Sequence, residues 1–370
     1  MTMLKKIFLT ASFFTSFICH AGSVEELKHS IAQDIFTHWN SNKGIIDEQF
    51  SLGKFTVDID GLVLSTETKS KVDQLETEIL EQRGLDSELK DFVIIRIANP
   101  GLYPLWQANI SPLIVPDADG NENEAVNAYN LLGETEELSP TELPNKPVLV
   151  LDIQRSKIMR ETARSMNQII QKTLNKSGIR TALNENTEPE EEEFPEEIHT
   201  SVIKKFRAEY IKELWLQPAE VYAIVTGVSP SRMAPQIDIV EMPVVDYQKI
   251  EYPINQIAIY WQRYRWAAAD MIFMEMDDKV QYKDIAQNLV KIAEEVLNNI
   301  EDPRVQKYAV IPQITNRIMD AFPESMWVDN DDVIDAVYTI QQNATYTDHT
   351  GAGGNVTVSI EPLVIGEVEL

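Results

Sequence analysis

Four short runs in the second half of the chain decide the expected fold: EVYAIV (220–225), QIDIV (236–240), NQIAIYW (255–261) and DMIFMEM (270–276). The second and fourth runs alternate in the way that half-buried strands do, and the third does so in part. Two more strand-like runs close the chain, at 335–341 and 356–365, around the loop DHTGAGGN. Helical periodicity interrupts these strands at about 282–322. The pattern predicts an antiparallel β-sandwich-like domain over 200–370 with a helical insertion.

The segment that opens this half has helical spacing. Over 200–216 it places Val202, Phe206, Tyr210 and Leu214 four residues apart. Side chains at this spacing share one face of a helix, so we expect a helix before the first strand of the sandwich.

The N-terminal half mixes both kinds of pattern. Helical periodicity covers 23–40, 69–83 and 156–176, and strand-like runs cover 55–64, 92–97, 112–115 and 147–153, with a weaker one at 125–132. This order predicts a mixed α/β unit over 22–182 and an α+β class for the whole chain. Between the halves, residues 183–199 (LNENTEPEEEEFPEEIH) are too acidic and proline-interrupted to bury a core, so they predict a linker.

The first 21 residues have the layout of a secretory signal peptide. Lys5 and Lys6 precede an apolar stretch from Ile7 to Ile18, and Ala21 ends a small-residue cleavage site. A lipid attachment at Cys19 is the alternative, but bulky Phe17 and Ile18 disfavour it. We therefore expect cleavage after Ala21 and a secreted or periplasmic bacterial protein, with no integral membrane segment after cleavage.

Composition narrows the classes of partner. The chain has 370 residues and a formal net charge of −27, and its single cysteine would leave with the signal peptide. Thiol chemistry and cysteine-based metal sites are then excluded from the mature protein. A strongly acidic surface repels nucleic acid and attracts divalent cations and basic partners. Solubility in a salty medium is the alternative reason for the charge.

Aspartates supply the strongest candidate for chemistry. Histidine is scarce, and the chain lacks the HExxH, GxSxG, P-loop and GxGxxG motifs. By contrast, aspartates follow one predicted strand and precede another: Asp277, Asp278, Asp284, Asp329, Asp331 and Asp332. Acidic loops at one end of a sandwich supply the oxygen ligands that calcium needs, as in sandwich domains of the C2 type. The alternative is that these aspartates cap helices and form turns.

Several segments also carry a family resemblance. They include AEVYAIVTG (219–227), the stretch 238–278, YKDIA (282–286), NDDVIDAVYTI (330–340) and GAGGNVTVSIEP (351–362), with 112–150 in the first half. Together they resemble a family of exported proteins of marine gammaproteobacteria such as vibrios, known as a domain of unknown function. The resemblance implies a source and a compartment, and it supplies no catalytic residues.

These observations favour an exported, acidic, non-enzymatic protein that binds a protein or polymer partner and is stabilised by calcium. The alternative is a periplasmic or extracellular hydrolase that uses Asp or Glu as general acid and base. No spacing singles out a catalytic pair, so the catalytic residues of this alternative are unknown, and no cofactor other than calcium is expected.

Overall fold

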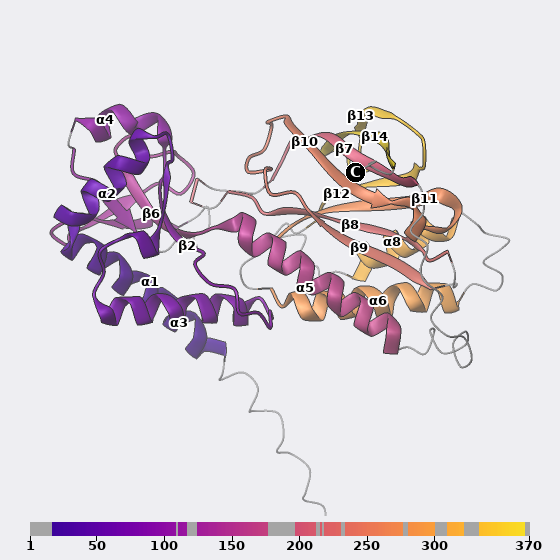
Figure 1. Cartoon of the computed structure of the whole chain (residues 1–370), viewed down its shortest axis with the longest axis horizontal. Helices are drawn as coiled ribbons and strands as arrows, with labels where there is room; N and C mark the ends of the chain where they lie inside the picture. Colours follow the sequence, from indigo (N-terminus) through magenta and orange to yellow (C-terminus); the bar gives the residue numbers. More distant parts are fainter. Residues whose placement is uncertain are drawn as a thin grey trace, which may run out of the picture. The chain divides into compact units, whose positions relative to one another are not determined.

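The computed structural model describes residues 17–108, 110–116, 124–176, 197–211, 215–216, 218–230, 234–276, 280–299, 309–321 and 333–366 (Figure 1). For residues 17–23 and 176 it describes the backbone alone. The described residues form two compact units. Unit 1 lies within Met1–Glu81, Glu88–Gln154 and Leu214–Gln217, and unit 2 lies within Gln82–Ser87, Arg155–Glu213 and Pro218–Leu370.

In its described residues, unit 1 combines helices with a six-stranded sheet. Its helices are α1 (Phe17–Thr37), α2 (Trp39–Ser51), α3 (Thr66–Gln82) and α4 (Tyr103–Gln107), with short 3-10 turns at Ile59–Gly61 and Pro100–Leu102. Its strands are β1 (Thr56–Asp58), β2 (Val93–Ile97), β3 (Leu113–Val115), β4 (Val126–Tyr129), β5 (Thr135–Leu138) and β6 (Val148–Ile153). The strand order is β1-β2-β6-β3-β4-β5, in which β3 and β6 are parallel and the other pairs are antiparallel.

Two adjacent inner strands of this sheet, β2 and β6, are buried along their whole length. Every residue of β2 and β6 is buried, as expected for apolar runs inside a sheet. Arg96 of β2 is a charged residue among these buried apolar side chains. Its Nε donates to the Asp152 carboxylate at 2.5 Å, and its Nη2 donates to the carbonyl oxygens of Trp215 and Leu216. Trp215 and Leu216 are buried in the same hydrophobic cluster. These contacts explain why residues 214–217 belong to unit 1.

The described part of unit 2 contains eight strands in two antiparallel sheets. The first sheet has the order β10-β7-β14-β13 and the second β12-β11-β8-β9. The strands are β7 (Glu197–Ala208), β8 (Val221–Val228), β9 (Pro235–Glu241), β10 (Tyr252–Tyr260), β11 (Ala268–Glu275), β12 (Val333–Gln341), β13 (Tyr346–Thr350) and β14 (Val356–Gly366). The helices are α5 (Arg155–Lys176), α6 (Tyr282–Asn298) and α8 (Val310–Ala321), with 3-10 turns at Trp261–Arg263 and Arg265–Ala267.

Alternation along β8 and β11 divides the apolar side chains between two cores. Ala223, Val225 and Phe273 belong to a cluster that also contains Phe206 and Val358 of the other sheet, so the two sheets pack face to face. The intervening residues of β8 and β11 belong to a second cluster with the helices. Both faces of the sheet β12-β11-β8-β9 are therefore covered.

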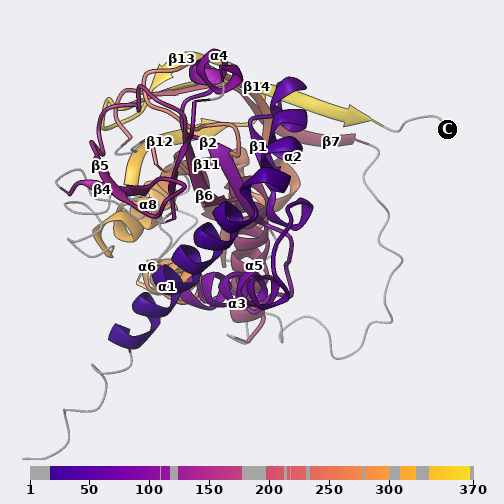
Figure 2. The ribbon, with the colours of Figure 1, turned by 90° about the vertical axis from the view of Figure 1, so that its left-hand side faces the viewer.

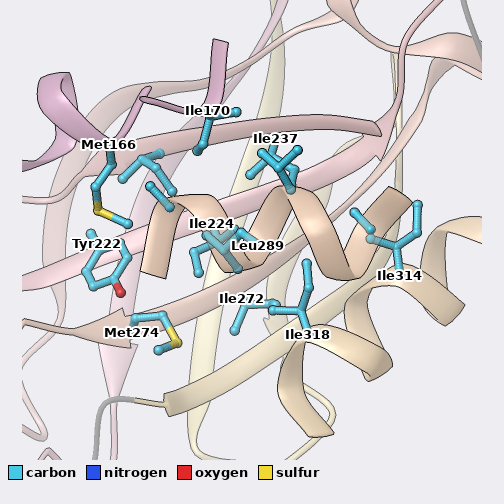
Figure 3. Packing of buried hydrophobic residues seen from close by; sticks show 14 of the residues in the cluster. Met166, Ile170, Tyr222, Ile224, Ile237, Ile272, Met274, Leu289, Ile314 and Ile318 are labelled. Carbon is cyan, nitrogen blue, oxygen red and sulfur yellow. The ribbon is translucent and has the colours of Figure 1, made fainter. Parts of the chain in front are cut away.

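Figure 3 shows the second cluster, in which helices α5, α6 and α8 pack on the sheet. Met166 and Ile170 of α5, Leu289 of α6 and Ile314 and Ile318 of α8 surround side chains of the strands. The strand residues shown with them are Tyr222, Ile224, Ile237, Ile272 and Met274. Two of these helices, α6 and α8, fall at the predicted insertion, and they supply one wall of this core.

The predicted α+β class is confirmed. The prediction of a helix over 200–216 is wrong, because the strand β7 occupies Glu197–Ala208. A spacing of four residues fits a strand as well as a helix, and pairing with β10 on one side and β14 on the other favours the strand.

The boundary between the units differs from the one that composition suggested. Composition placed it at the acidic stretch 183–199, whereas unit 2, apart from the short segment Gln82–Ser87, starts at Arg155. Helix α5 accounts for this difference, because Met159, Met166 and Ile170 bury their side chains in the core of unit 2. Residues 197–199 begin β7, and 183–196 lie outside the described residues.

Candidate functional site

Most of the predicted calcium ligands lie outside the described residues. This is true of Asp277, Asp278, Asp329, Asp331 and Asp332. Asp284 is described: it is exposed in the first turn of α6, where its backbone N–H donates to the Gln281 carbonyl at 3.0 Å. Among the described side chains, no group of three or more His, Cys, Asp or Glu could hold a metal ion. The calcium site therefore stays a prediction.

The strands that flank these aspartates are neighbours. β11 pairs antiparallel with β12, and the pairing brings Met274 opposite Val333. Asp277 and Asp278 follow Met274 by three and four residues in the sequence, and Asp331 and Asp332 directly precede Val333. The chain thus leaves β11 and enters β12 at the same end of one sheet. A metal site shared by the two groups of aspartates requires that these two strand ends lie next to each other, and this register places them so.

Asp270 is the described carboxyl group with the clearest functional chemistry. It lies on β11 with no exposed surface, and its Oδ1 accepts the Thr339 backbone N–H at 2.7 Å. Burial raises the pKa of Asp270 to about 6, although the bonds from Thr339 and the Thr315 hydroxyl favour the ionised form. A raised pKa suits a general acid. However, Thr226 and Thr315 beside it are also fully buried, so a substrate has no access to this carboxyl.

The raised pKa of Asp270 makes stability depend on pH. The folded state holds the proton more tightly than the unfolded chain, whose reference pKa is 3.8. This contribution is complete below the unfolded pKa and is lost as pH rises through about 6. Asp270→Asn keeps the acceptor for Thr339 and removes the charge, so it should raise the free energy of unfolding by about 2–3 kcal/mol at pH 8. Urea unfolding at pH 8 and pH 4 measures this. An equal effect at both values would contradict the assigned charge.

Unit 1 carries an open groove of about 510 Å³ between the N-terminal part of α1 and the start of β4. Its lining includes Glu25, Glu26 and Glu124 together with His29 and Tyr129. The His29 ring packs edge-on against Tyr129 at 4.8 Å, and its Nε2 lies 2.9 Å from the Gln33 amide nitrogen. The histidine is thus engaged by packing and hydrogen bonding at the rim of an acidic groove.

An exposed β-ribbon is the most distinctive surface of unit 2. β14 pairs with β7 from Val356 to Gly366, but β13 covers β14 only up to Ile360. Likewise, the pairs between β10 and β7 reach only to Thr200, so residues 197–199 of β7 lie beyond the last pair with β10. We call residues 197–200 and 361–366 the β7–β14 ribbon. Figure 2 shows the end of β14 running beside the start of β7.

Apolar side chains lie on the unpaired part of this ribbon. Leu363, Val364 and Ile365 are 43%, 46% and 36% exposed, and neighbouring residues of a strand point to opposite faces. Beyond Ile360, none of the described strands pairs with the outer edge of β14. The sequence predicted a strand here but not its exposure. One signal was present: the consecutive Leu-Val-Ile after Pro362 breaks the alternation of a strand with one buried face.

In the described part of the chain, no helix combines the length and apolarity that a membrane crossing requires.

A family model described as "Protein of unknown function (DUF3103)" matches residues 28–368. No curated protein and no solved structure matches the chain. The family match confirms the resemblance to a domain of unknown function, while the marine gammaproteobacterial source stays a prediction.

Proposed function

The chain belongs to the DUF3103 family of proteins of unknown function, so we propose its role from its own residues: an exported, non-enzymatic protein that docks a partner on the β7–β14 ribbon. The observation that carries this proposal is an edge of β14 with which no described strand pairs beyond Ile360, together with three consecutive exposed apolar side chains. A partner that covers this edge would satisfy backbone groups and bury apolar surface together.

Physical chemistry supports docking at such an edge. Unpaired N–H and C=O groups beside apolar side chains are a template for another strand, and proteins usually protect them with lysine, bulges or short strands. The ribbon has no Lys or Arg between 361 and 366, and Pro362 blocks only one donor. An extended segment that pairs with a sheet edge gains main-chain hydrogen bonds, and its alternate side chains give specificity. The edge therefore has the features of a strand-addition site.

Export is part of the proposal, and the signal-like residues 1–21 support it. The first described buried apolar side chains of α1, Val24, Leu27 and Ile31, all follow the expected cleavage point after Ala21. Cleavage would thus leave the apolar face of α1 in the mature chain. A mature protein that begins at Gly22, identified by its intact mass, is the expected product in the producing cells, and an uncleaved chain would contradict export by this route.

Calcium binding is a second element of the proposal, supported by the register that brings Met274 opposite Val333. Ligand binding to the folded state alone raises its stability by mass action. We therefore expect the melting temperature to rise by several degrees with millimolar calcium and to fall again with a chelator. Asp331→Asn together with Asp332→Asn should abolish the shift. An identical midpoint with calcium and with chelator would remove calcium from this proposal.

Site-specific photo-crosslinking tests the docking proposal. A photoreactive amino acid at Val364 should form an adduct of defined mass when the protein is made in its own cells. Ile250, in the loop before β10, is a matched control because both side chains are 46% exposed. The adduct should appear from position 364 and not from position 250. If position 364 reacts no more than position 250, the ribbon is not the docking site.

A further inference from the structure

We propose that the occupant of the β7–β14 ribbon is an extended polypeptide segment with alternating apolar and basic side chains, which adds as an antiparallel strand to the outer edge of β14. This inference rests on the proposed function and specifies the chemistry of the partner. It follows from the position of the free edge, from the side chains beside it and from the charge around it.

The free edge is that of β14 and not that of β7. At the β7 end of the ribbon, the Gln262 side-chain amide donates to the Glu197 carbonyl at 3.2 Å, so this backbone already has a partner. From Glu361 to Gly366, directly after the last β13 pair (Tyr346 with Ile360), no described strand pairs with the outer edge of β14. An incoming strand would continue the line of β13. All pairs in this sheet are antiparallel, which favours the same direction for the added strand.

The open stretch has the length of an ordinary strand. Residues 361–366 extend about 20 Å at the usual rise of a strand, which accommodates five or six residues of a partner. Leu363 and Ile365 share one face of the ribbon, and Val364 lies on the other. A partner with apolar side chains on alternate positions would pack beside one of these faces and leave its intervening side chains towards solvent. Those intervening positions can carry charge.

The charge around the ribbon selects a basic partner. Glu197 and Glu361 are exposed on the ribbon, and the ribbon residues include no Lys or Arg. In the sequence, β7 directly follows the run EPEEEEFPE (188–196), and β14 is followed by Glu367 and Glu369. The whole chain carries a formal charge of −27. Complementary charge accelerates association and excludes wrong partners. A second copy of the chain would bring like charges together, so it is the less favoured occupant.

Defined peptides test this chemistry on the full mature protein. The probe is a fluorescent octapeptide that alternates lysine and valine, compared with one that alternates glutamate and valine. A third peptide has the lysine–valine sequence with N-methyl groups at alternate backbone nitrogens, which removes donors needed for pairing. Fluorescence anisotropy should show saturable binding of the first peptide, weakened by salt. Binding of the other two should be at least about tenfold weaker.

Variants of the protein locate the binding. Val364→Lys should weaken binding of the lysine–valine peptide at least about tenfold, whereas Ile250→Lys adds the same charge elsewhere in unit 2 and should leave most of it. Equal binding of the glutamate peptide or of the N-methyl peptide would overturn the inference, as would an unchanged affinity of Val364→Lys. Sedimentation that shows a dimer, dissociated by Val364→Lys, would assign the ribbon to a second copy instead. A specific adduct at position 364 without this peptide selectivity would keep the proposed function and reject the basic partner.

Discussion

Replacing Asp335 by asparagine is expected to lower the free energy of unfolding of unit 2 by about 3–5 kcal/mol. Asp335 is buried on β12, and its carboxylate accepts four backbone N–H groups: Ala336 and Gly353 on Oδ1 at 2.7 and 2.6 Å, and Asn355 and Val356 on Oδ2, both at 2.8 Å. Asparagine has one acceptor oxygen, so its amide nitrogen would face two N–H groups. Each buried donor left unsatisfied costs about 1–3 kcal/mol.

Urea unfolding of Asp335→Asn measures this effect, and Asp348→Asn is the matched control. Asp348 lies on β13 of the other sheet of unit 2, is exposed, and accepts from the Ser359 hydroxyl at 3.3 Å. Its replacement should change stability by less than about 1 kcal/mol. Similar losses of stability in both variants would show that the Asp335 carboxylate does not stabilise the loop 351–355 between β13 and β14. The glycines of this loop depend on the same contact, because a Cβ at Gly351 would overlap the Asp335 carboxylate.

The strands of unit 2 were largely predictable from the sequence, and the first of them was not. Alternating or continuous apolar runs correspond to β8, β9, β11 and β14, because each has at least one face in a core. β7 was predicted as a helix, since Val202 and Phe206 fit both periods and only pairing with two neighbouring strands distinguishes them. The two helices of the insertion were predictable because their apolar stripes face one sheet.

The sites were less predictable than the strands. The GAGG loop was visible in the sequence, but its partner Asp335 lies 16 residues before Gly351, and only the folded hairpin brings them together. The exposure of Leu363 to Ile365 depends on where β13 begins, at Tyr346, which no local pattern predicts. Of the six predicted calcium ligands, Asp284 is described and exposed on α6, and the other five lie outside the described residues.

A second large effect is expected at Glu220, which carries the most buried ionic contact described in unit 2. Arg83 has no exposed surface and donates from Nη1 and Nη2 to the two Glu220 carboxylate oxygens at 2.8 and 3.1 Å. Arg155 adds a bond to Oε1 at 3.2 Å. The backbone carbonyl of Arg83 also accepts from the Tyr282 N–H at 3.1 Å. These contacts explain why the short segment Gln82–Ser87 belongs to unit 2.

Glu220→Gln should lower the free energy of unfolding by about 3–5 kcal/mol, because it deprives two largely buried guanidinium groups of their carboxylate. Arg83→Met should cost less, since Glu220 keeps Arg155 and the methionine fills part of the space. Glu251→Gln is the control: Glu251 pairs with Lys205 at 3.2 Å on the surface, where an ion pair contributes about 0–1 kcal/mol. Urea unfolding of the three variants gives the order. A cost for Glu220→Gln no larger than for Glu251→Gln would show that the buried pair does not stabilise unit 2.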